Sequence, residues 1–247
     1  MVDIPAISVE TSDYVPALVV VDMQNDFVSG SLAVPDATSI LPIVNALIDL
    51  PFVVRVATQD FHPNNHVSFA KTHERPEYTT IDIYHPEDKD KALGMEQTLW
   101  PIHCVANTEG ASFAPGLEHS KFDAVIHKGT HPSIESYSAF RDIWGRGETE
   151  LPKALKQAGI TDVYFCGVAG DYCVKYSAKD SVDYGYNTWV VKDAVKSISS
   201  SSLAWDEMEK KGVKFTSFVE VKGRVAGKLI TRSFQCVLRV SWIGNGS

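Results

Sequence analysis

The sequence predicts an α/β fold of three layers, in which helices cover both faces of a six-stranded parallel sheet. Short apolar runs rich in β-branched residues recur along the chain, and such runs are typical of strands buried on both faces. Between several of these runs, apolar residues recur every three or four positions, which is the period of an amphipathic helix. Strands that alternate with helices form a parallel sheet with right-handed crossovers, so we expect a single α/β/α domain.

The first part of the chain contains two expected strands and one expected helix. The strands are residues 17–22 (ALVVVD) and residues 52–57 (FVVRVA). Between them lies a helical repeat, with Ser39 as its N-cap and Pro42 in the first turn, where proline is tolerated. The apolar residues of this repeat are Ile40, Ile43, Val44, Leu47 and Ile48. Residues 58–121 are irregular and rich in His, Pro, Asn and Gly, and so long a stretch inside a compact domain is usually functional.

The second part of the chain continues the alternation. Further strands are expected at residues 123–127, 162–168, 187–191 and 213–219. Helices are expected at residues 151–158, 174–184 and 203–211, each followed by Gly159, Gly185 or Gly212 as a helix-ending glycine. The sequence thus supplies six strands for one sheet.

Length, charge and cysteine content exclude several classes of protein. A chain of 247 residues can bury enough surface to fold without a disulfide or a structural metal. The formal net charge of -8 argues against general affinity for nucleic acid. No apolar run approaches the about 18 residues of a membrane helix, and the N-terminus lacks the features of a secretory signal. Four cysteines without regular spacing indicate reduced thiols, so we expect a cytoplasmic protein.

The two ends of the chain differ from the rest. Residues 1–14 are polar and are interpreted as a lead-in, followed by the domain at residues 15–221. Residues 222–247 form a basic tail, in which apolar residues alternate at period two between 234 and 242. We interpret this tail as an extra edge strand or a loose extension, with a partner-binding arm as the alternative.

Reactive side chains follow four of the expected strands. Ligands of open parallel sheets bind beyond the carboxyl ends of the strands. Asp22 follows the first strand, Asp60 and His62 the second, Lys128 the third and Cys173 the fourth. An acid, a base, a thiol and a metal-type pair are therefore expected at one edge of the sheet.

Cys173 is the candidate nucleophile. It lies where a strand gives way to a helix, and a helix N-terminus favours the thiolate. The N–H groups of this helix start, with that of Ala169, could hold an oxyanion. Asp22 ends a buried strand, where desolvation raises a carboxyl pKa and suits proton transfer. The structural alternatives are a packed cysteine, as we expect for Cys166, a turn-capping Asp22 and an ion-paired Lys128.

Asp60 and His62 form a candidate metal pair, because residues at i and i+2 of an extended segment share one side. His66, His85 and His103 are candidates for a third ligand. One carboxylate with two histidines suits a zinc or iron site. The chain lacks the dinucleotide, P-loop and GxSxG motifs, so these residues remain the strongest signal for chemistry.

Seven segments in order resemble the nicotinamidases (pyrazinamidase type) of the isochorismatase-like cysteine hydrolase superfamily. They are VVVDMQNDF (19–27), GSLAVP (30–35), TQDFHPNNHVSFA (58–70), LWPIHCV (99–105), IHKG (126–129), YSAFRD (137–142) and GVAGDYCV (167–174). The resemblance implies a Rossmann-like sheet of strand order 3-2-1-4-5-6. It also implies that Asp22, Lys128 and Cys173 form a catalytic triad.

The resemblance assigns further roles. It selects His103 as the third metal ligand beside Asp60 and His62, with zinc expected and iron or manganese as alternatives. It implies a cis peptide between Val168 and Ala169, which with Cys173 would form the oxyanion site. It also places Phe27, Trp100 and Tyr137 around a nicotinamide ring.

The implied activity is hydrolysis of nicotinamide to nicotinate and ammonia through a Cys173 thioester, which would feed NAD salvage. The expected partner is this small-molecule substrate, with no nucleic acid and no membrane, and a homo-oligomer is compatible with the sequence. One alternative is an amidohydrolase of the same superfamily that acts on a carbamoyl or ureido compound. Another is a partner-binding protein without activity, which the Asp22, Lys128 and Cys173 set disfavours.

Overall fold

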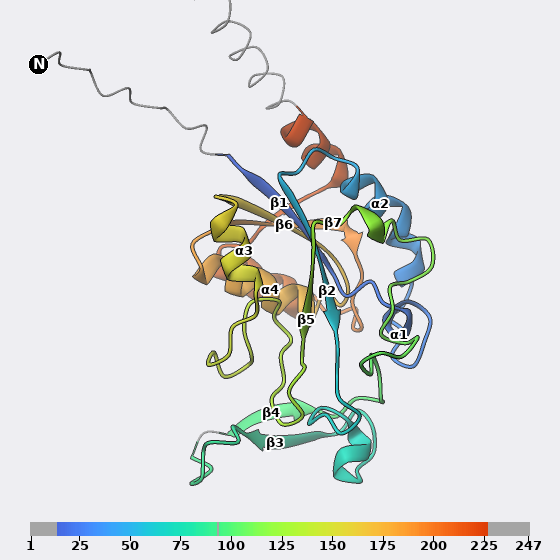
Figure 1. Cartoon of the computed structure of the whole chain (residues 1–247), viewed down its shortest axis with the longest axis vertical. Helices are drawn as coiled ribbons and strands as arrows, with labels where there is room; N and C mark the ends of the chain where they lie inside the picture. The colour runs from blue at the N-terminus through green and yellow to red at the C-terminus, as the bar shows by residue number, and fades with distance from the viewer. Residues whose placement is uncertain (1–13, 93, 227–247) are drawn as a thin grey trace, which may run out of the picture.

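The computed structural model describes residues 14–92 and 94–226 of the chain. Six parallel strands form one sheet in the order β5-β2-β1-β6-β7-β8, which confirms the predicted order 3-2-1-4-5-6 (Figure 1). The strands are β1 (Pro16–Val21), β2 (Val54–Asp60), β5 (Ala124–Lys128), β6 (Asp162–Gly167), β7 (Asn187–Val195) and β8 (Lys214–Thr216). Every residue of the central strand β1 is buried, as a strand covered on both faces requires.

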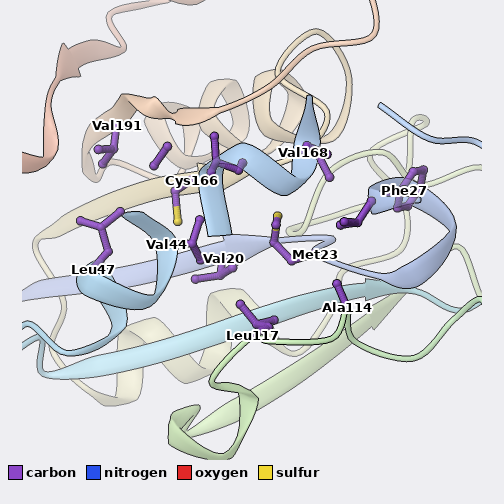
Figure 2. Packing of buried hydrophobic residues seen from close by; sticks show 14 of the residues in the cluster. Val20, Met23, Phe27, Val44, Leu47, Ala114, Leu117, Cys166, Val168 and Val191 are labelled. Carbon is purple, nitrogen blue, oxygen red and sulfur yellow. The ribbon is translucent and has the colours of Figure 1, made fainter. Parts of the chain in front are cut away.

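Helices cover the two faces of the sheet, as predicted. The α-helices are α1 (Asn25–Val28), α2 (Leu41–Ile48), α3 (Leu151–Gln157), α4 (Cys173–Asp183) and α5 (Leu203–Lys211). Short 3-10 helices are η1 (Ala37–Ile40), η2 (Ala70–His73) and η3 (His119–Lys121). Alternate residues of a strand point to opposite faces. Val19 and Val21 of β1 accordingly pack with α3, α4 and α5, whereas Val20 packs with Val44 and Leu47 of α2 (Figure 2).

The start of the first long helix differs from the expectation. Ser39 does not cap it, because η1 precedes it and α2 begins at Leu41 with Pro42 in its first turn. The Ser39 hydroxyl instead donates to the carbonyl of Asp36. The helical period of the sequence extends into this 3-10 turn, so periodicity alone does not locate the boundary.

The long segment expected to be irregular contains a β-hairpin. Strands β3 (Thr80–Tyr84) and β4 (Gly94–Thr98) pair antiparallel and lie beyond the ends of β2 and β5 (Figure 1). Ile81 and Ile83 alternate with polar residues in β3, but Met95 is the sole aliphatic side chain of β4. The second strand therefore carries too weak a pattern to reveal the pairing from sequence.

The last predicted strand is too long. Strand β8 covers three residues, and residues 218–226 are helical. The reason is a capping box, because the carboxylate of Glu220 accepts from the backbone N–H and the hydroxyl of Ser217. Val221 and Val225 of this helix are buried in the core, so the domain boundary placed at 221 lies inside a helix. The lead-in up to residue 13 and the alternating segment at 234–242 lie outside the described residues.

No helix in the described part of the chain is long and apolar enough to span a membrane.

Candidate active site

The carboxyl edge of the sheet brings the predicted reactive residues together. Asp22 immediately follows β1, Asp60 ends β2, Lys128 ends β5 and Cys173 begins α4. The strands β2 and β5 pair in register at Asp60 and Lys128, and β1 lies beside β2. These side chains therefore lie together at the carboxyl ends of the parallel strands, as expected from their positions in the sequence.

Lys128 lies at the centre of the site. Its Nζ is 2.9 Å from Asp22 Oδ2, donates to Cys173 Sγ at 3.2 Å, and also contacts Asp60 Oδ1. Its exposure is 2%, that of Asp22 is 0% and that of Cys173 is 5%. A buried ammonium is tolerated only where anionic partners compensate its lost hydration, and here two carboxylates do so.

The Cys173 thiol does not have the low pKa expected from its helix N-terminus. Burial raises the pKa of Cys173 well above its usual range, and the ammonium of Lys128 offsets only part of this effect. Burial also raises the pKa of Asp22, again against the opposing effect of Lys128. The resting nucleophile is therefore a thiol, and its activation requires a nearby base such as Asp22.

The Asp22 carboxylate is fixed by a residue that sequence reasoning missed. The hydroxyl of Thr58 donates to Asp22 Oδ1 at 2.6 Å and accepts from the backbone N–H of Asp22 at 3.2 Å. Asp22 has a φ of 49°, a left-handed conformation that turns the chain away from the sheet. Thr58 lies on β2 with no local pattern that would distinguish it from an ordinary strand residue.

Asp60, His62 and His103 form a group suited to a metal ion. One potential ligand atom of each lies within 4.8 Å of the others. The Nε2 atoms of His62 and His103 are 3.5 and 3.9 Å from Asp60 Oδ2. Their Nδ1 atoms donate to the carbonyls of Gly129 at 2.8 Å and Pro101 at 2.7 Å, which leaves both Nε2 lone pairs available. This donor set fits a divalent ion such as zinc.

Glycine is required beside this group. A Cβ at Gly129 would lie 2.4 Å from the His62 ring, and the φ of Gly129 is +61°. Only glycine places its carbonyl against His62 Nδ1 without a clash.

The two other candidate histidines do not join the metal group. His66 stacks on His62 with ring centroids 4.1 Å apart, but its ring nitrogens contact Ser68 Oγ at 2.8 Å and the Ile134 carbonyl at 3.2 Å. Burial lowers the pKa of His66 to about 2, so it is neutral. His85 lies beside Trp144 and Arg146, away from the group.

Aromatic side chains lie next to the metal group and the thiol. Phe27 contacts the ring of His103 at a centroid distance of 5.3 Å. Trp100 Nε1 donates to the hydroxyl of Tyr137 at 3.1 Å, and the Trp100 ring packs edge-on against Tyr172. Tyr172 precedes the nucleophile and was not among the predicted residues, although aromatic residues adjoining a nucleophile are a usable sequence signal.

The turn before Cys173 contains the predicted backbone feature. The peptide bond between Val168 and Ala169 is cis. The N–H of Val168 donates to the carbonyl of Val21 at 3.0 Å, and the carbonyl of Ala169 accepts from Val174 at 3.1 Å. These bonds tie the turn both to β1 and to the first turn of α4, so it lies directly beside the thiol.

A comparison with protein families decides the membership of the chain. The model that describes the isochorismatase domain matches residues 16–219. The chain belongs to the isochorismatase family. The matched residues run from the first strand of the sheet to just beyond the last, so the match covers the whole sheet.

Within this family, the chain is similar in sequence to several nicotinamidases. The nicotinamidase of Acinetobacter baylyi is 41% identical over 204 residues, covering 80% of this chain and 90% of the relative. The structure of the yeast nicotinamidase bound to the inhibitor nicotinaldehyde is 33% identical, with a TM-score of 0.79, and the match covers 82% of this chain and 99% of that chain. The pyrazinamidase of Pyrococcus horikoshii in complex with zinc is 37% identical, with a TM-score of 0.65 and coverages of 82% and 99%.

Proposed function

We propose that this protein is a nicotinamidase, which hydrolyses nicotinamide to nicotinate and ammonia and thereby supplies NAD salvage. The observation that carries the proposal is the contact of one buried lysine with both halves of the site. Lys128 touches Asp22 and Cys173 on one side and the metal-type ligand Asp60 on the other. The Cys173 thiol, which can attack an amide carbon, thus lies beside three side chains that can bind a metal ion. Such an ion could in turn bind the pyridine nitrogen of the substrate.

The first half of the reaction forms a thioester. Asp22 takes the proton of the Cys173 thiol, and the resulting thiolate attacks the carboxamide carbon. We assign the N–H groups of Ala169 and Cys173 to the oxyanion, at the turn that begins with Val168. Asp22 then gives its proton to the leaving nitrogen, so the carbon–nitrogen bond breaks and ammonia departs. Lys128 compensates the charge on Asp22 and on the thiolate.

The second half hydrolyses the thioester. Asp22, now ionised, takes a proton from water as the water oxygen attacks the thioester carbon. The carbon–sulfur bond breaks, Asp22 returns its proton to Cys173, and nicotinic acid leaves and loses its carboxyl proton to the solvent as nicotinate. Asp22 thus acts as base and acid in turn, and the contact with the ammonium of Lys128 stabilises its ionised form.

Asp60, His62 and His103 would hold one divalent metal ion, which when bound supplies a Lewis acid for the pyridine nitrogen and for water. We propose zinc, with iron and manganese as alternatives, because two imidazoles and one carboxylate suit zinc and the Pyrococcus relative is described with it. Phe27, Trp100 and Tyr137 are proposed to enclose the ring of the substrate.

Ammonia release tests the function directly. We expect the purified protein to release ammonia from nicotinamide far faster than from ureido and carbamoyl compounds, since these lack a pyridine nitrogen for a metal ion. A coupled ammonia assay over both sets of substrates at equal concentration measures the ratio. Preferred turnover of a ureido compound would contradict the proposal and favour the alternative amidohydrolase.

Removal of the metal is expected to abolish activity while the fold survives. The core does not need a metal for its stability, because the strands on either side of the site are buried among apolar residues. Metal content, activity and circular dichroism should be measured after chelation and for His103→Ala. His66→Ala is the control, since the ring nitrogens of His66 contact Ser68 and Ile134. A fully active metal-free enzyme, or metal loss in His66→Ala alone, would contradict the ligand assignment.

A further inference from the structure

Gln24 is a buried glutamine that no step of the reaction uses. It lies two residues beyond Asp22, in the turn between β1 and α1, and its exposure is 0%. Its side-chain Oε1 accepts from the backbone N–H of Asp60 at 2.8 Å, and its Nε2 donates to the carbonyl of Asp60 at 2.8 Å. The second N–H of the amide donates to the carbonyl of Ala111 at 2.9 Å. The amide therefore pairs with both polar groups of a single residue.

The pairing takes the place of a missing strand neighbour. In the sheet, β1 and β2 are in register as far as Val20 and Ala57, and Asp22 then turns the chain away with its positive φ. On its other side β2 continues to pair with β5 up to Asp60 and Lys128. The N–H and carbonyl of Asp60 on the β1 side would thus lack ladder partners, and the side chain of Gln24 supplies them. Buried backbone groups are nearly always paired, so this contact decides where the peptide of Asp60 lies.

The same glutamine is tied to the proposed base. The backbone N–H of Gln24 donates to the carbonyl of Asp22 at 2.7 Å. The carboxylates of Asp22 and Asp60 both contact Lys128. Gln24 is thus bonded to the main chain of both carboxylates that share the lysine, which places it where it sets their separation.

We propose that Gln24 is a positioning residue that holds Asp60 in its ligand orientation through the Asp60 peptide. The inference rests on the proposed function only in taking Asp60 as a metal ligand. Groups that orient metal ligands typically contribute about 10-fold to 100-fold to metal affinity. The side chain of Gln24 bonds to the backbone of Asp60 and not to its carboxylate. Loss of the Gln24 amide therefore leaves all three metal ligands present, with Asp60 wrongly placed.

The chain offers a matched control. Gln59 is also a buried glutamine, with an exposure of 8%, and its Nε2 donates to the same carbonyl of Ala111 at 2.8 Å. Its side chain therefore shares one acceptor with Gln24, whereas the two bonds to the Asp60 peptide belong to Gln24. Methionine has nearly the same side-chain volume as glutamine but no amide group. The difference in zinc affinity between Gln24→Met and Gln59→Met therefore isolates the two hydrogen bonds to Asp60.

The experiment measures zinc affinity of the full chain by competition with a chromophoric chelator, together with thermal unfolding in the presence of EDTA. We expect Gln24→Met to bind zinc about 10-fold to 100-fold more weakly than the parent, and Gln59→Met to bind as the parent does. If Gln24→Met fails to fold, Gln24→Asn replaces it, because its amide is one methylene short of the Asp60 peptide and the same loss of affinity is expected.

The readout separates positioning from a structural role. A purely structural glutamine would lower the unfolding temperature in EDTA and leave the zinc affinity of the folded protein unchanged, and that result would overturn the proposal. An equal loss of zinc affinity in Gln59→Met would also overturn the proposal. A parent chain that binds no zinc would overturn it as well. Failure of the proposed function is distinct from these outcomes, because a parent that binds zinc but does not hydrolyse nicotinamide still yields the affinity comparison.

Discussion

Cys173→Ala is expected to release no ammonia from nicotinamide, yet to fold and to bind the substrate. The variant lacks the sulfur that forms the thioester, and the described residues place no other thiol in contact with Lys128. The side chain is small and lies at a helix start, so its truncation costs little packing. Ammonia release in a single-turnover assay, substrate binding by calorimetry and mass spectrometry of an acid-quenched parent reaction measure the three parts of the expectation.

The other cysteines serve as controls. Cys104→Ala and Cys166→Ala should keep their turnover after correction for stability, because both thiols are fully buried in the apolar core. Cys236→Ala, outside the described residues, should do the same. Alkylation should modify Cys173 before Cys104 and Cys166, but slowly at neutral pH, since burial raises the pKa of all three thiols. Measurable turnover by Cys173→Ala, or a first label elsewhere, would contradict the thioester mechanism.

The parallel sheet was predictable because local signals and a general rule act together, whereas its strand order was implied by the resemblance to a known family. Residues 17–21 and 163–166 are β-branched or apolar throughout, and such a composition is typical of strands buried on both faces. Right-handed crossovers then leave few topologies. Because catalytic groups of parallel sheets gather at the carboxyl edge, positions such as Asp22 and Lys128 could be singled out from their place after a strand alone.

The supporting residues were not predictable by the same means. Thr58 and Gln24 act through bonds to residues 36 positions away in the chain, and no local spacing marks such a pair. The third metal ligand was likewise not predictable from spacing in the sequence. His66 follows His62 as closely as a ligand would, so spacing alone does not separate it from His103; the resemblance selected His103, and the contacts of His66 with Ser68 and Ile134 agree with that selection.

The pKa of the nucleophile was expected to be low, and the structure shows that burial raises it. The helix N-terminus at Cys173 is a local feature that favours the thiolate, and it was visible in the sequence. Burial is a property of the whole fold, and it raises the pKa of Cys173 against the opposing effect of Lys128. The raised pKa supports the role of Asp22 as the general base, because a thiol that is protonated at rest needs a base to form the thiolate.

Asp22→Asn is therefore expected to lower kcat by about 10²-fold to 10⁴-fold, the usual range for loss of a general base. The amide keeps the shape of the carboxylate and still accepts the hydrogen bond that Thr58 donates at 2.6 Å. It cannot take the thiol proton or return it to the leaving nitrogen. Lys128 retains the carboxylate of Asp60 as a partner, so the buried ammonium is not left uncompensated and little stability should be lost.

Asp162→Asn provides the matched control for this loss of rate. Asp162 is another buried carboxylate of the same sheet, 6% exposed, but it begins β6 at the edge opposite the site. It accepts hydrogen bonds from Thr161 at 2.7 Å and from Trp189 at 3.4 Å, so its replacement should lower the unfolding temperature and leave kcat per folded molecule unchanged. Steady-state kcat and thermal unfolding of both variants separate the two roles. If Asp22→Asn lost stability and kept its kcat, Asp22 would be a turn-capping residue and the thiol of Cys173 would need another base.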